Sequence, residues 1–159
     1  MAFVLLQVLI LNHISFLGYI TPYLYIAFIL FLPVDMNRWK VLILAFIIGL
    51  TIDVFGDSGG IHAAACTVIA YLRPAFLRTA FGLSYDNHTI SFYKSPPKER
   101  LTYILLMTLT HHFVLFTLVF FDFSHILLIL KNTLFSGIFT TLLLSLTIIL
   151  LRRSKKSRR

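Results

Sequence analysis

The chain has 159 residues, of which 58% are hydrophobic and 13% are charged, and its mean hydropathy is +0.90. A soluble domain is roughly 45–50% apolar and about 25% charged. The composition therefore excludes a water-soluble core, a disordered chain and a disulfide-linked secreted domain. Cys66 is the only cysteine, so an internal disulfide and a cysteine-based metal site are excluded as well. These figures predict an all-α integral membrane protein with a single domain.

The first apolar run, residues 2–34, carries no charge. As one helix it would be roughly 48 Å long, too long for one upright crossing. The segment Gly18–Pro22 interrupts it, and proline is tolerated in the first turn of a helix but not in its middle. We therefore predict two short helices, at residues 2–17 and 22–33. One long helix, giving five crossings in total, remains the alternative.

Four further apolar runs follow, at residues 39–55, 61–72, 101–121 and 126–151. The second of these is expected to end at Arg73–Pro74 or to continue, kinked, toward Phe81. The long polar stretch 82–100 is too short to form a soluble domain. The prediction is thus a compact six-helix transmembrane bundle over residues 1–151, followed by a basic tail at residues 152–159.

The positive charges fix the expected topology. With six helices and a cytoplasmic tail, 13 of the 14 Lys and Arg residues lie on the cytoplasmic side, and only Lys131 lies on the other. This asymmetry is typical of the positive-inside rule and predicts that both termini are cytoplasmic. With five helices only the N-terminus would move outside. The tail is expected to lie against anionic lipid; no stacking aromatic residues accompany it, so we expect no nucleic-acid partner.

Catalytic and metal-binding patterns are missing from the sequence. The six histidines form no His-x-x-x-His pair, and the adjacent His111 and His112 point about 100° apart on a helix. One interhelical hydrogen bond from either residue is the expected role. We expect no metal, no cofactor and no enzymatic activity, since no acid–base constellation is visible.

Small residues recur at helical spacing in the third and fourth runs. Ala45, Gly49 and Asp53 are four residues apart, and a second series follows the turn at residues 56–60, at Gly59, Ala63 and Thr67. Small residues allow close approach of membrane helices. The pattern predicts a tight antiparallel hairpin.

Asp53 is an ionisable residue inside an apolar run, where a charge costs about 2.5–3.5 kcal/mol on insertion scales. It either caps the turn or pairs with His62, or it contacts a partner or ligand, or it belongs to a proton relay. If it only satisfies the turn, Asp53→Asn is expected to be nearly silent. In the last run, Gly137, Thr141 and Ser145 predict either an internal packing seam or a docking face for another membrane protein.

A longer motif joins these positions. It comprises Gly49, Leu50 and Asp53, the turn Gly56–Gly59, Gly60, His62 and Ala63, and Ala70, Tyr71 and Leu72. This pattern resembles the bacterial rod-shape-determining membrane protein family MreD. Leu6–Gln7, Asn12–His13 and Pro22 agree with that layout.

The resemblance implies a fold similar to the substrate-binding subunits of vitamin transporters. It also implies a non-enzymatic scaffold of the cell-elongation machinery in the bacterial inner membrane. Such proteins associate with the bitopic protein MreC and, through it, with the actin-like MreB and the peptidoglycan synthases. Asp53, Gly49 and Gly60 correspond to signature positions of the family, and no catalytic residue is implied.

Two other functional classes remain open. A substrate-binding subunit of a small-molecule transporter would need a polar pocket, for which Asp53, His62, His111 and Asn132 are the scattered candidates. A membrane-embedded enzyme is the third class.

Overall fold

The computed structural model of the protein describes residue 7, residues 21–86, residue 92 and residues 95–157. Within these residues the regular structure is helical and contains no strand. Three segments, Arg38–Gly56, Pro97–Phe120 and Ile126–Leu150, are long and apolar enough to cross a membrane. The chain is thus a helical membrane protein, as its composition predicts. The predicted first helix, residues 2–17, lies outside the described residues except for Gln7.

The described elements are α2 (Ile26–Leu30), α3 (Arg38–Gly56), α4 (Ile61–Phe81), α5 (Leu83–Asp86), α6 (Pro97–Phe120), the 3-10 helix η2 (Phe123–His125) and α7 (Ile126–Ser157). The largest departure from the sequence prediction is α2, which has five residues where residues 22–33 were expected. Residues 21–25 are not helical because side chains elsewhere in the bundle bind their backbone.

Three other helices extend well beyond their predicted bounds. α4 does not stop at Arg73–Pro74 but continues to Phe81 with Pro74 in its interior. α6 starts at Pro97 and not at residue 101, because the missing N–H of a proline is harmless at the first helical position. α7 continues to Ser157, so residues 152–157 of the predicted tail at residues 152–159 are helical.

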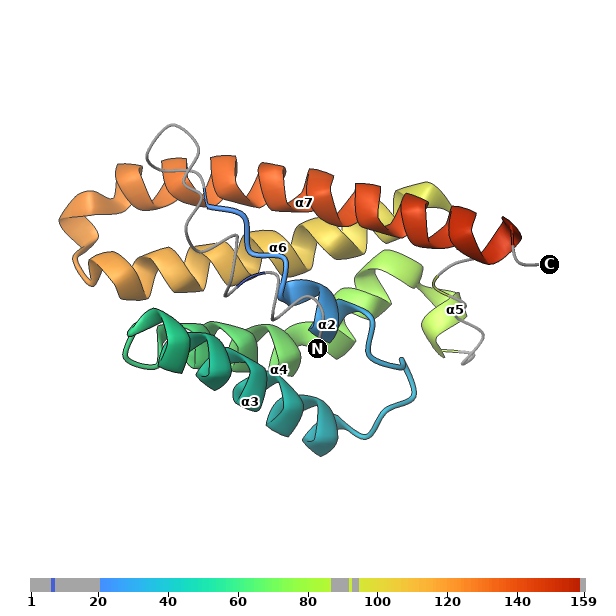
Figure 1. Ribbon diagram of the computed structural model, residues 1–159, viewed down its shortest axis with the longest axis horizontal. Helices are drawn as coiled ribbons and strands as arrows, with labels where there is room; N and C mark the ends of the chain where they lie inside the picture. Colours follow the sequence, from blue (N-terminus) through green and yellow to red (C-terminus); the bar gives the residue numbers. More distant parts are fainter. Residues whose placement is uncertain (1–6, 8–20, 87–91, 93–94, 158–159) are drawn as a thin grey trace.

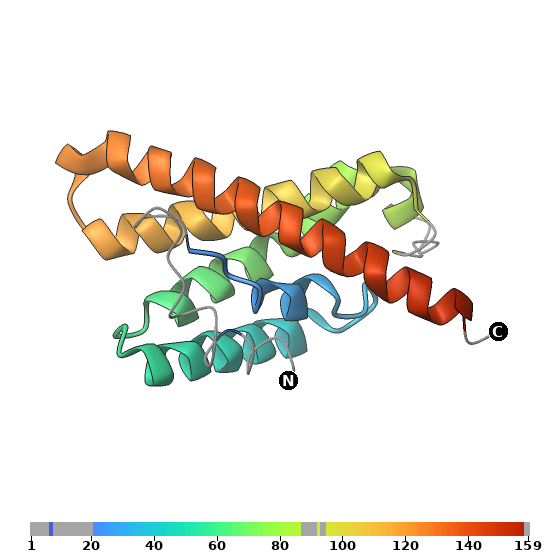
Figure 2. The ribbon, with the colours of Figure 1, turned by 45° about the horizontal axis from the view of Figure 1, so that its top comes forward.

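The long helices form two antiparallel pairs, α3 with α4 and α6 with α7 (Figure 1). Contact between α4 and α6 joins the pairs, and the short α2 lies between them and touches α3, α4 and α6. Figure 2 shows α7 crossing over α6 on the side away from α3. The turns 57–60 and 121–125 lie at one end of the bundle, whereas α5 and the C-terminus lie at the other (Figure 1).

The surface of the bundle is largely apolar, and its mainly apolar interior contains a set of buried polar side chains. Val54 on α3 and Leu127 on α7 are 72% and 80% exposed. By contrast, Thr108, His111 and His112 on α6 are fully buried. A bilayer offers apolar side chains a favourable environment and leaves polar groups to find partners inside the protein. Polar side chains of the candidate site, among them Asp53, His111 and His112, accordingly lie inside the bundle.

Candidate functional site

The hairpin between α3 and α4 is held by the Asp53 carboxylate. Its Oδ1 accepts hydrogen bonds from Ser58 Oγ at 2.5 Å and from the His62 backbone N–H at 3.0 Å. Its Oδ2 accepts from the Ala63 backbone N–H at 2.8 Å. Gly60, the N-cap residue of α4, has no side chain for this purpose. Asp53 therefore caps the next helix from the preceding one and satisfies N–H groups that a helix start leaves free.

These bonds decide between the expectations for Asp53. Turn capping is confirmed. The pairing with His62 involves the backbone of that residue and not its ring. The effect of Asp53→Asn stays a prediction, and on this geometry we expect a larger loss than the sequence alone suggests, because both carboxylate oxygens accept. An amide has one acceptor oxygen and would turn its NH2 group toward a backbone N–H.

Gly49 permits the close approach of the two helices. A Cβ atom at this position would lie 2.5 Å from Ala63 Cα and 2.5 Å from the His62 carbonyl oxygen. The predicted tight hairpin is confirmed, and its contact pairs Gly49 with Ala63. Gly59 belongs to the turn and not to α4. Gly60 has a different role: its φ of +96° is a conformation that other residues rarely adopt, and a Cβ there would meet open space.

A cluster of aromatic and histidine side chains lies next to the hairpin. The Tyr25 hydroxyl is 2.7 Å from His62 Nδ1 and 2.8 Å from His111 Nε2. The Tyr23 ring packs against both histidines, with centroid distances of 5.5 Å to His62 and 6.1 Å to His111. Tyr25 thereby joins His62 and His111, two of the four candidates for a polar pocket. Asp53, a third candidate, accepts a hydrogen bond from the His62 backbone N–H.

His112 belongs to a separate hydrogen-bond chain. Its Nδ1 donates to the Thr108 carbonyl oxygen at 2.7 Å, since a carbonyl only accepts. Its Nε2 lies 3.2 Å from Thr140 Oγ1 on α7. Both adjacent histidines thus make contacts outside α6, one with Tyr25 and one with α7, where a single interhelical bond was expected.

The non-helical segment 21–25 depends on side chains from distant parts of the chain. Tyr23 N–H donates to Thr140 Oγ1 at 3.3 Å, and Leu24 N–H donates to Gln7 Oε1 at 2.8 Å. Gln7 Nε2 in turn donates to the Pro22 carbonyl oxygen at 3.0 Å. Irregular backbone inside a membrane protein is stable only where its polar groups find such partners.

Arg73 is buried in the second half of α4, where its guanidinium binds the chain after α2. It donates to the Leu32 carbonyl oxygen at 2.5 Å, to the Pro33 carbonyl oxygen at 3.3 Å and to the Tyr103 hydroxyl at 3.1 Å. A guanidinium with several donors in one plane suits this set of acceptors. Arg73 was considered in the sequence only as a topology signal. The proline after it was the reason to expect the helix to end there, because the residue before a proline is disfavoured in helical conformation.

The small residues of α7 pack inside the protein. A Cβ at Gly137 would lie 2.8 Å from Leu109 Cδ2 on α6. Thr141 Oγ1 lies 2.8 Å from Thr108 Oγ1. The internal packing seam is therefore confirmed for these two residues.

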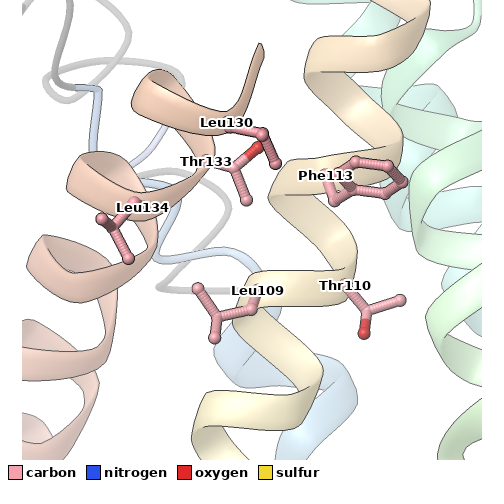
Figure 3. Close-up of a pocket in the computed structure, with 6 residues that line it drawn as sticks. All are labelled: Leu109, Thr110, Phe113, Leu130, Thr133 and Leu134. Atoms are coloured by element: carbon pink, nitrogen blue, oxygen red, sulfur yellow. The ribbon is translucent and has the colours of Figure 1, made fainter. Parts of the chain in front are cut away.

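A groove of about 450 Å³ lies beside this seam (Figure 3). Its lining comes from α6 and α7, with the residues Leu109, Thr110, Phe113, Leu130, Thr133 and Leu134. Thr133 lies on the side of α7 that faces α6 (Figure 3), and its hydroxyl has no hydrogen-bond partner in the described structure. The side-chain amide oxygen of Asn132, the fourth candidate for a polar pocket, also has no hydrogen-bond partner in the described structure. The exposed lining of the groove is apolar, and the Thr133 hydroxyl is buried.

Among the described residues no group of three or more His, Cys, Asp or Glu side chains is arranged to hold a metal ion. Comparison of the chain with protein-family models, with curated proteins and with solved structures gives no match.

Proposed function

We propose that the protein is a non-enzymatic membrane scaffold of the bacterial cell-elongation complex. The observation that carries this proposal is the motif of the α3–α4 hairpin, whose residues resemble those of the MreD family. The turn between α3 and α4 brings four of these residues together, namely Gly49, Asp53, Gly60 and Ala63. Gly49 allows the close approach to Ala63, and Asp53 caps the helix that follows Gly60. The Asp53 carboxylate accepts three hydrogen bonds in this hairpin, which favours a structural role over general acid–base chemistry.

The proposed placement is the bacterial inner membrane, with six crossings and both termini in the cytoplasm. α4 has 21 residues and runs antiparallel to α3 along its length (Figure 1), so a crossing by α3 requires one by α4. Arg38 begins α3, Arg78 lies in the last turn of α4 and Arg100 lies near the start of α6, and these helix ends face the end of the bundle that holds α5 (Figure 1). Lys131 lies near the start of α7, which is at the opposite end. This separation agrees with a cytoplasmic α5 end.

The proposed direct partner is a bitopic MreC-like protein, which would connect the chain to MreB and the peptidoglycan synthases. A bitopic protein has one transmembrane helix to offer. We place that helix in the groove between α6 and α7, because its lining is apolar and open to the surface. An apolar transmembrane helix would fill this groove through van der Waals packing, which drives helix association in lipid.

Co-purification from host membranes tests this function. The tagged full-length chain is expected to retain the MreC-like protein. Leu134→Trp, which fills the groove, should reduce that retention at least tenfold, corresponding to about 1.4 kcal/mol. Leu142→Trp is the matched control, since Leu142 is an exposed α7 leucine outside the groove lining. Failure of the unmodified chain to retain an MreC-like protein would refute the proposal, whereas equal retention by both variants would refute only the groove.

A substrate-binding subunit of a small-molecule transporter is the second candidate. The observation in its favour is the non-helical segment 21–25 beside the buried cluster of Tyr25, His62 and His111. Interrupted helices often mark substrate sites in transporters. This function would require an ATPase module to be retained in the same co-purification.

A further inference from the structure

Tyr25 couples two histidines through one hydroxyl group. Its oxygen lies 2.7 Å from His62 Nδ1 and 2.8 Å from His111 Nε2. A hydroxyl has one proton and can donate to only one of these nitrogens. To make both bonds, the other nitrogen must carry a hydrogen and donate to the Tyr25 oxygen. When the Tyr25 proton lies in one of these two bonds, the tautomer of either histidine therefore determines that of the other.

The two rings of this pair have different surroundings. His62 is half-buried in the first turn of α4, and its backbone N–H donates to Asp53. His111 is fully buried, and its Nδ1 has no hydrogen-bond partner in the described structure. His62 is thus the ring that a proton from outside the protein can reach.

The negative charge of the Asp53 carboxylate would favour protonation of the His62 ring. The carboxylate is only 5% exposed. The partners that the structure gives it are the Ser58 hydroxyl and two backbone N–H groups, none of which carries a formal charge. An unpaired buried charge is costly, and a proton on the neighbouring His62 would balance it.

Among the described residues, three other titratable groups pack against the pair. The Tyr23 ring lies against both histidines, the His112 ring centroid is 5.5 Å from that of His111, and Cys66 on α4 adjoins Tyr25. Asp53 on α3 is the carboxylate of this group. α7 contributes a hydroxyl, that of Thr140, through His112.

We propose that His62, Tyr25 and His111 form a proton-binding site that takes up one proton. The neutral pair has two arrangements, in which Tyr25 donates either to His62 or to His111. Only the arrangement in which Tyr25 donates to His111 leaves His62 Nε2 without a hydrogen. A proton added there makes His62 a cation that keeps its Nδ1–H as a donor to Tyr25, while the Tyr25 hydroxyl donates to His111 Nε2. His111 stays neutral with its hydrogen on Nδ1. Proton uptake on α4 thus selects the tautomer of a buried ring on α6.

His112 is an internal control for this site. Its Nδ1–H is fixed by the Thr108 carbonyl, and its Nε2 is bonded to Thr140. This arrangement allows a single tautomer of the neutral ring. Two adjacent histidines on one helix are therefore expected to respond differently to pH.

Nitrogen-15 NMR of the histidine rings tests the site, using the full chain in lipid nanodiscs between about pH 5 and 8. As the pH falls, His62 should become charged. His111 should shift to its Nδ1–H tautomer with the same midpoint, and His112 should not change. In Tyr25→Phe, His62 should still titrate but His111 should no longer follow. A neutral His62 over the whole range, or a response of His111 that survives in Tyr25→Phe, would overturn the proposal.

A second variant decides the matter if Tyr25→Phe does not fold. His62→Gln keeps a side chain able to bond to Tyr25 but removes the titrating ring. The pH response of His111 should be lost in this variant. A response of His111 equal to that of the unmodified chain would show that His111 senses pH without His62 and would refute the coupling.

Discussion

Replacing Gly49 with alanine should force α3 and α4 apart. The added Cβ would lie 2.5 Å from Ala63 Cα, and ordinary contact begins near 3.4 Å, so the backbones must separate locally by roughly 1 Å. The atoms that must move are backbone atoms and have no alternative rotamer. The same separation stretches the bond between Asp53 and the Ala63 N–H, which is 2.8 Å long.

The expected loss can be put on an energy scale. Overpacking typically costs about 1–3 kcal/mol, and a weakened hydrogen bond adds about 1 kcal/mol. The higher helix propensity of alanine offsets about 1 kcal/mol. We therefore expect Gly49→Ala to lower the free energy of unfolding by about 1–3 kcal/mol.

Unfolding in mixed micelles with a denaturing detergent, followed by the helical circular dichroism signal, measures this loss. Gly137→Ala is the matched control. Its Cβ would meet Leu109 Cδ2, the end of a flexible side chain, and the next atom is 3.8 Å away. We expect a change below about 1 kcal/mol for this control. If Gly49→Ala were as stable as the unmodified chain, the close hairpin packing would be wrong.

Three further predictions follow from the bonds and the topology. Asp53→Asn should lower the free energy of unfolding by about 1–3 kcal/mol, because an amide turned toward a backbone N–H loses one bond and leaves one donor unpaired; an unchanged unfolding midpoint would contradict the capping geometry. Arg73→Gln should cost about 2–3 kcal/mol through the loss of charge-assisted bonds, whereas the exposed Arg78→Gln should change the same midpoint little. A reporter enzyme active only outside the cytoplasm should be active when fused after Asp57 and silent after Asp86; the opposite pattern would overturn the proposed topology.

The sequence predicts the α3–α4 hairpin well because its signals are local. Small residues at a spacing of four, a glycine-rich turn and one acid in an apolar run all act within about 20 residues. Gly49, Asp53 and Ala63 accordingly meet as expected. The exact acceptor geometry at Asp53 could not be predicted, since it depends on the position of the following helix relative to the carboxylate.

Long-range bonds explain what the sequence does not reveal. The composition of residues 22–25 predicts a helix, but the Tyr23 N–H donates a hydrogen bond to Thr140, which is 117 residues away in the sequence. Tyr25 joins His62 and His111 across 37 and 86 residues. No periodicity within a single run encodes such partners, so the shortened α2 and the buried cluster emerge only from the folded arrangement.

The central proposal is that this chain serves cell elongation. Its most direct test is depletion of the protein in a rod-shaped bacterium that encodes it, with cell width and length followed by microscopy over successive divisions. We expect the cells to widen and become round, and a plasmid copy of the unmodified chain to restore the rods. Cells that remain rod-shaped after the protein is lost would contradict the proposal.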